Sequence, residues 1–119
     1  MQHTGMVRVS RNCRDSQKAW EVISQIDSMP KWAVGVKKTT ITSMAKKLGG
    51  TRKITLGDDI IVERIVGWRS REYLSYIALE GLPVDWYHAT MSVGSVLRWE
   101  SYFGSSNMSD EKFEEFKKK

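Results

Sequence analysis

The chain contains a single cysteine, Cys13, so no disulfide can form within it. Arg11 and Arg14 lie close to Cys13 in the sequence, and positive charge of this kind can lower a thiol pKa and make the thiol reactive. A structural thiol at the end of a strand is the favoured interpretation. Cysteine-protease and redox chemistry both need a second residue that the sequence does not supply.

Long apolar runs are also missing. No segment approaches the ~20 apolar residues that a membrane-spanning helix needs. The first residues, MQHTGMVRVSRNCR, lack the apolar core of a secretory signal. We therefore expect a cytoplasmic protein without membrane insertion. Its 119 residues, 40% of them hydrophobic, are enough for one packed domain spanning residues 1–119.

Metal and cofactor motifs are absent as well. The two histidines, His3 and His88, form no metal-ligand spacing with Cys13. The sequence contains no glycine-rich phosphate loop, nucleophile elbow or H-E-x-x-H motif. His88 is expected on the sheet surface, and no cofactor or metal is expected.

The net charge of +5 raises the question of nucleic-acid binding. No RNA-binding aromatic motif, zinc-finger spacing or helix-turn-helix pattern accompanies the charge. Solvated surface is therefore favoured over a phosphate-binding track, and no nucleic-acid partner is expected. The basic residues fall mostly at strand ends and turns, as the pairs Lys37–Lys38, Lys46–Lys47 and Arg52–Lys53 and as Arg69 and Arg71.

The first 34 residues predict a strand and two short helices. Residues 6–12 alternate between apolar and polar, which is typical of a strand. Asp15 can cap a helix whose apolar stripe includes Trp20 and Ile23. Pro30 should end that helix, and a short helical turn is expected over residues 31–34.

The segment from residue 49 to 105 is the most informative part of the chain, because it is a succession of strand-length segments separated by short turns. A second helix pattern opens at Ser109 and completes an α+β order of elements. A long antiparallel sheet curved around a helix can enclose a cavity, which points to a binder of small molecules. The strands are expected at residues 36–44, 51–56, 60–68, 73–79, 86–93 and 95–103.

Five sequence words in this order resemble the START-like helix-grip superfamily, and within it the polyketide cyclase/dehydrase and lipid-transport group, which is related to the plant abscisic-acid receptors. The words are DSQKAWEVISQIDSMPKW, GGTRKITL, IVERI, YIALEGLPVDWYHATMSV and GSVLRWESYF. The resemblance covers residues 6–116. It implies a helix-grip fold: a curved, seven-stranded antiparallel sheet around a C-terminal helix, with two small helices after the first strand.

The resemblance also implies a set of cavity residues. Polar receptor residues that hold a ligand through water match Glu63 in VERI, Tyr87 in VDWY and Glu100 in WESY. Arg98 shares a strand face with Glu100 by alternation and could neutralise it. Exposed positions or edge ion pairs are the alternative for the charged residues, and ordinary core is the alternative for the apolar lining. That lining is expected from Ile54, Leu56, Ala89 and Met91.

Three functions follow from these expectations. The first is a carrier or sensor of a small, largely apolar molecule such as a lipid, an isoprenoid or a polyketide. The alternative is a polyketide cyclase/dehydrase-type enzyme, in which buried Glu63 or Glu100 acts as acid or base. A protein-interaction module with a vestigial pocket is the third.

The C-terminal helix departs from the family pattern. Members of the family close the cavity with a long helix, whereas SDEKFEEFKKK supplies about three turns. Phe113 and Phe116 lie three residues apart, share a helix face and could dock into the mouth of the grip. The apolar surface left uncovered favours a homodimer.

Overall fold

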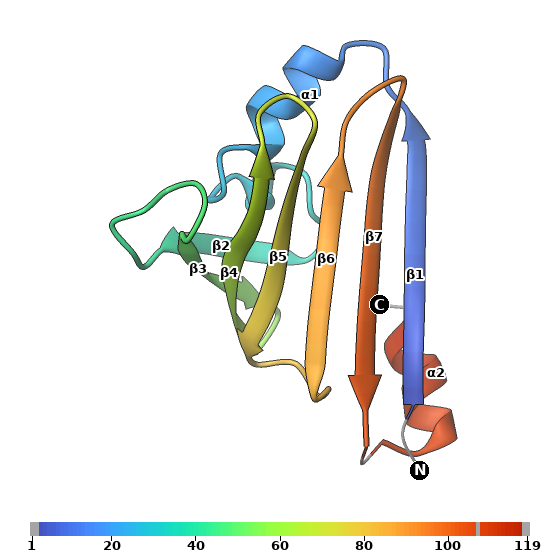
Figure 1. The fold of residues 1–119 in the computed structure, drawn as a ribbon. Helices are drawn as coiled ribbons and strands as arrows, with labels where there is room; N and C mark the ends of the chain where they lie inside the picture. The colour runs from blue at the N-terminus through green and yellow to red at the C-terminus, as the bar shows by residue number, and fades with distance from the viewer. Residues whose placement is uncertain (1–2, 107, 118–119) are drawn as a thin grey trace.

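The structure is a computed structural model that describes residues 3–106 and 108–117. Within these residues, seven strands, two α-helices and one 3₁₀ turn follow one another, and Figure 1 shows their arrangement. The first part runs β1 (His3–Asn12), α1 (Ser16–Ile23), η1 (Met29–Lys31) and β2 (Val36–Ile41). The second part runs β3 (Thr51–Leu56), β4 (Asp59–Arg69), β5 (Tyr73–Glu80), β6 (Trp86–Ser92), β7 (Val96–Ser105) and α2 (Asp110–Lys117).

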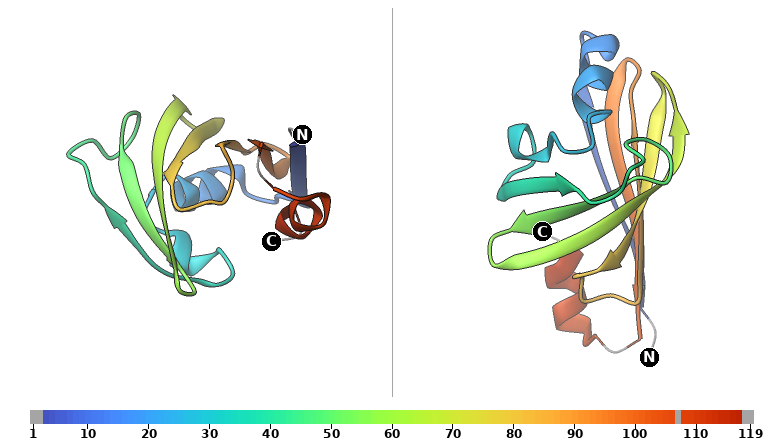
Figure 2. Two further views of the ribbon diagram at one scale, coloured as in Figure 1. Left: turned by 90° about the horizontal axis from the view of Figure 1, so that it is seen from below. Right: turned by 90° about the vertical axis from the view of Figure 1, so that its left-hand side faces the viewer.

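The strands form one antiparallel sheet in the order β1-β7-β6-β5-β4-β3-β2. Consecutive hairpins link β2 to β7, and β1 then closes the sheet by pairing with β7 along its whole length. The sheet curves, and both α-helices and η1 lie on its hollow side (Figure 2). The helix-grip fold expected from the sequence is confirmed, including the two small helices after the first strand.

The first helix begins as its sequence predicts. The side chain of Asp15 accepts a hydrogen bond from the backbone N–H of Lys18 at 3.0 Å, which caps α1. Pro30 lies inside η1, so the helical turn begins at Met29 and ends at Lys31, earlier than the expected residues 31–34. Ser28 accepts a hydrogen bond from the Trp32 indole at 3.0 Å and fixes the chain on both sides of η1.

Strand register defines an inner face of the sheet. Ile65, Tyr76, Ala89, Ser101 and Val7 lie opposite one another across five strands and point to the side that the helices cover. The main core forms where α1 and the residues just after it pack on this face. Its buried members are Trp20, Ile23, Ile26, Ile65, Leu74, Tyr76, Ala89 and Met91.

The short helix α2 covers the opposite end of the inner face, beside β1 (Figure 1). Phe113 and Phe116 both contact Phe103 of β7, with ring centroids 5.5 and 4.9 Å away. A Cβ atom on Gly5 would lie 3.0 Å from the ring of Phe113, so glycine at this position lets α2 approach β1 closely. The docking of both phenylalanines expected from the sequence is confirmed.

Among the residues that the structure describes, no helix is long and apolar enough to cross a membrane.

Candidate functional site

Four polar side chains meet on the inner face between the main core and α2. Arg52 comes from β3, Glu63 from β4, Tyr76 from β5 and Tyr87 from β6. We call these four residues the inner polar group. Arg52, Glu63 and Tyr76 are each 5% exposed or less, and Tyr87 is half-buried. Buried polar atoms are costly unless they are paired, so this group requires a specific arrangement of partners.

Arg52 organises the inner polar group. Its Nε donates a hydrogen bond of 2.9 Å to Oε1 of Glu63, and its Nη2 lies 2.8 Å from the same oxygen. Its Nη1 donates to the backbone carbonyl of Ile26 at 3.1 Å, just beyond α1. The guanidinium also lies 4.8 Å from the ring centroid of Tyr76, within cation–π range. One side chain thus joins β3, β4, β5 and the segment after α1.

Burial changes the acid–base properties of this group. Loss of hydration raises the pKa of Glu63 above its ordinary value, and the charge and hydrogen bond of Arg52 only partly oppose that rise. Burial, followed by the nearby charge of Glu63, raises the pKa of Tyr76 well above 10.0. Burial likewise raises the pKa of Tyr87. Both phenols therefore stay protonated at neutral pH and can donate hydrogen bonds.

A buried indole N–H lies beside the group. Nε1 of Trp99 lies near enough to the Tyr76 hydroxyl to favour its ionised form, yet it makes no hydrogen bond of good geometry within the described part of the chain. An unsatisfied buried donor costs about 1–3 kcal/mol and is a place where a water or ligand oxygen is stabilising.

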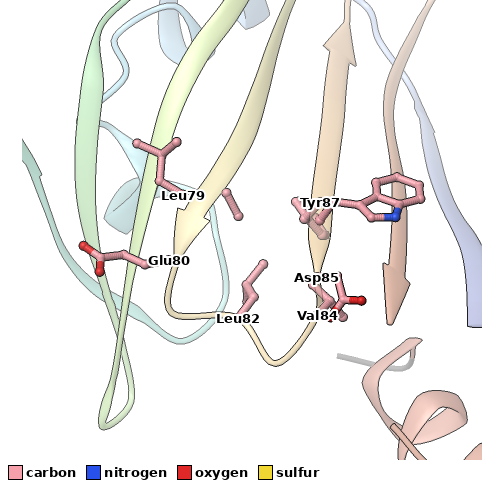
Figure 3. Close-up of a pocket in the computed structure, with 8 residues that line it drawn as sticks. Leu79, Glu80, Leu82, Val84, Asp85 and Tyr87 are labelled. Carbon is pink, nitrogen blue, oxygen red and sulfur yellow. The ribbon is translucent and has the colours of Figure 1, made fainter. Parts of the chain in front are cut away.

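A gap in the sheet leads to Tyr87. The pairing of β5 with β6 ends at Ile77 and His88, so the residues beyond this pair are separated. The hollow between them measures about 40 Å³. Figure 3 shows Leu82 pointing from the β5–β6 loop into this space, with Tyr87 on the far strand. We call this gap the slot; it is lined by Ala78, Leu79, Glu80, Leu82, Val84, Asp85, Trp86 and Tyr87.

The expected apolar lining is placed mainly in the core. Ala89 and Met91 are buried against α1, and Ile54 is buried against Met29 and Ile61. Leu56 lies at the end of β3 and is 36% exposed. Ordinary core describes the packing of Ala89, Met91 and Ile54. Their contact with a ligand stays a prediction.

The expected orientation of Glu100 and Arg98 is corrected by the register of β7. Glu100 lies opposite Arg8 and Thr90, on the outer face, while its neighbours Trp99 and Ser101 point inward. It pairs there with Arg8 at 3.3 Å and with Arg98 at 3.7 Å. Strand alternation requires this, because Trp99 and Phe103 must share the buried face. Glu63 and Tyr87 do point inward, and their role in binding stays a prediction.

Two residues of the inner polar group were not expected from the sequence. The sequence favours the solvated surface for Arg52 as for Lys53, yet Arg52 is 1% exposed. Alternation would have placed Arg52 on the face of Ile54, and Tyr76 on the face of Leu74. His88, expected on the surface, does lie on the outer face opposite Tyr102.

No group of three or more histidine, cysteine, aspartate or glutamate side chains that could hold a metal ion occurs among the described residues.

Solved structures with the same fold are similar over nearly the whole chain. The major latex-like protein 151 of Panax ginseng has a TM-score of 0.77 and 14% identity, covering 95% of this chain and 89% of its own. The protein Ara h 8.0201 has a TM-score of 0.73 and 13% identity, covering 99% and 89%. Norcoclaurine synthase from Thalictrum flavum, in complex with dopamine and hydroxybenzaldehyde, has a TM-score of 0.73 and 13% identity, covering 97% and 78%.

At these identities the likeness establishes the fold. The sequence matches no protein-family model and no curated protein.

Proposed function

Because the chain has the START-like helix-grip fold, we propose that it binds a small, largely apolar molecule on the inner face of its sheet, as a carrier or sensor. The main observation behind this proposal is that the inner polar group lies between two apolar regions. The core around α1 is on one side of it, and Phe103 with the phenylalanines of α2 is on the other. Such a site binds apolar surface and orients one polar end of the ligand.

The slot is the proposed entrance. Its volume of about 40 Å³ has room for one or two water molecules, whereas ligand pockets measure ~300–1,000 Å³. Binding must therefore widen the interior. The β5–β6 loop and α2 are the elements to move, since α2 is only eight residues long and is attached mainly through Phe113 and Phe116.

A cavity kept open without ligand would be costly. At about 24 cal/mol per Å³, a dry space of ~300 Å³ costs ~7 kcal/mol, comparable to the whole stability of many domains. A pocket that opens only with its ligand avoids this penalty. The affinity for the ligand is lower in return, because part of the binding free energy is used to open the pocket.

A thermal-shift screen tests the proposal. The ligand panel contains fatty acids, sterols, isoprenoids, aromatic polyketides and small phenols, the last because dopamine and hydroxybenzaldehyde occupy a structure of the same fold. A ligand at a hundred times its Kd should stabilise the protein by about 2.7 kcal/mol. Ala78→Trp, which fills the slot, should abolish the response, whereas Val66→Trp on the exposed outer face should keep it. A panel without any response contradicts the proposal.

An enzyme of the polyketide cyclase/dehydrase type is the second candidate, and the raised pKa of Glu63 favours it. A carboxyl group that holds its proton nearer neutral pH is a better general acid. Turnover of a polyketide-type substrate that is lost in Glu63→Gln, with substrate binding retained, would establish this function. Binding of the substrate without turnover would favour the carrier or sensor function.

The homodimer and the cytoplasmic location stay predictions. Light scattering over a dilution series tests the first, and localisation of a tagged chain tests the second.

A further inference from the structure

The loop between β2 and β3 exposes two large apolar side chains. Met44 is 99% exposed and Leu48 is 59% exposed. We call residues 42–50 the docking loop; Figure 1 shows it extending beyond the ends of β2 and β3 at the left of the molecule. Scattered apolar residues are normal on a protein surface. Two large apolar side chains on one protruding loop, neither of them packed into a core, suggest a binding surface.

The docking loop has a defined backbone. The hydroxyl of Ser43 accepts from the N–H of Thr51 at 2.8 Å and donates to the carbonyl of Ala45 at 2.7 Å. Gly49 and Gly50 bond to both backbone groups of Ile65 in β4 at 2.8 Å. A Cβ on Gly50 would lie 2.8 Å from the Ala45 carbonyl, so glycine is required where the loop folds back. The exposed side chains of Met44 and Leu48 therefore extend from a loop whose backbone is held by hydrogen bonds.

Positive charge surrounds the apolar tip. Lys46 and Lys47 lie between Met44 and Leu48 in the loop itself. Arg64 and Lys53 lie on the outer face near the loop, opposite Thr51 and Thr40, and Lys38 lies on the same face farther along β2, opposite Thr55. None of these five cations pairs with a carboxylate among residues 3–106 and 108–117. The acidic turn at Asp58 and Asp59 is at the other end of β3.

A surface hollow continues from the loop across the same strands. Its volume is about 380 Å³, and its walls offer ammonium groups and threonine hydroxyls. The ammonium groups and hydroxyls can donate hydrogen bonds to phosphate oxygens, while Ile60 adds an apolar side chain to the lining. The hollow is lined by Lys38, Thr40, Thr42, Lys53, Thr55 and Ile60.

From this combination we propose that the docking loop and the adjoining outer face of β2–β4 bind the surface of an anionic phospholipid bilayer. Met44 and Leu48 enter the boundary between headgroups and acyl chains, and the five cations face the lipid phosphates. A nucleic acid would use the cations but leave the aliphatic tip in water, and none of the residues around the hollow is an aromatic on which bases could stack. The inference is independent of any ligand on the inner face.

Co-sedimentation with vesicles tests the inference. The full chain should bind phosphatidylcholine vesicles that contain phosphatidylglycerol, bind pure phosphatidylcholine weakly, and dissociate as salt is raised. Lys46→Gln with Lys47→Gln should lower the partition constant about 25-fold, since each lysine near the surface contributes about fivefold. Met44→Ser with Leu48→Ser should lower it at least fivefold at unchanged charge.

Two matched variants act as controls. Val34→Ser removes a 98% exposed apolar side chain before the other end of β2, and Lys112→Gln removes an exposed lysine from α2. Both should bind as the unaltered chain does. Absence of vesicle binding at low salt, or loop variants that bind normally, would overturn the proposal. It would equally be overturned by preferred binding to an oligonucleotide that depends on Lys46 and Lys47 but not on Met44.

Discussion

Arg52 contacts a single carboxylate oxygen of Glu63 with two of its nitrogens, Nε at 2.9 Å and Nη2 at 2.8 Å, while both side chains are almost completely buried. The third nitrogen, Nη1, donates a hydrogen bond to the backbone carbonyl of Ile26. The pair therefore connects the interior of the grip with the segment that follows α1.

Removal of one partner should be costly. Arg52→Met leaves the Glu63 carboxylate buried without its counter-charge, and we expect a loss of about 3–5 kcal/mol in the free energy of unfolding. Urea denaturation measures this loss. The double variant Arg52→Met with Glu63→Leu should recover most of the stability, because no buried charge remains.

Lys53→Met is the matched control, since Lys53 is the exposed neighbour of Arg52 in β3. Its effect should stay within about 0.5 kcal/mol. An Arg52→Met variant as stable as this control would contradict the buried ion pair.

Stability should depend on pH through Glu63. Because burial raises the pKa of this carboxyl above 4.5, the folded chain binds the proton more tightly than the unfolded chain. The stabilising contribution is then complete below pH 4.5 and is lost as the pH rises through the folded-state pKa. The difference in unfolding free energy between the unaltered chain and Glu63→Gln should fall over this interval. A difference that grows with pH would mean that Arg52 lowers the pKa instead.

Gly5 should tolerate no larger side chain. A Cβ there meets Phe113 at 3.0 Å and Phe103 at 3.1 Å, so Gly5→Val must push α2 away from β1. We expect a loss of roughly 1–3 kcal/mol by overpacking, with faster amide exchange in α2. Thr4→Val, at an exposed outer position of the same strand, should change neither quantity. Normal protection of α2 in Gly5→Val would show that the helix is not packed against β1.

The aromatic contacts of α2 should be what keeps this helix folded and docked on the sheet. Phe113 is buried among His3, Gly5 and Phe103, so Phe113→Ala should release the helix and cost about 1.5–3 kcal/mol. An isolated segment of eight residues is too short to stay helical in water. Circular dichroism should therefore show a loss of about one short helix, with the sheet signal retained. Glu115→Ala on the exposed side of α2 is the control, and equal spectra for both variants would contradict the docking.

Local rules predicted most of the elements, although α1 ends at Ile23, well before Pro30, and β2 ends at Ile41 and not at residue 44. Asp15 caps α1, the glycine turns separate the strands, and alternation fixes which residues of β6 point inward. These features depend on neighbours within a few residues, which a sequence displays directly. The sequence did not display the residues that α2 contacts, because Gly5 and Phe103 lie far from Phe113 along the chain.

The errors in the site have two physical causes. Glu100 was assigned to the interior by likeness of sequence words, although alternation with Trp99 and Phe103 already required the outer face. The sequence favours solvent for Arg52 because it stands beside Lys53 near the start of a strand, like the other basic pairs at strand ends and turns. Its partner Glu63 lies on the next strand, and only the β3–β4 register brings them together.

The most direct test of the proposed function is a titration of ¹⁵N-labelled protein with the best ligand of the thermal-shift screen, followed by NMR. We predict saturable shifts at the Trp99 indole N–H and at the amides around Tyr76 and Tyr87, with the outer-face amides of Arg8 and Arg98 unchanged. Tyr87→Phe should weaken binding without loss of fold. Shifts confined to the outer face, or none at saturating ligand, would contradict binding inside the grip.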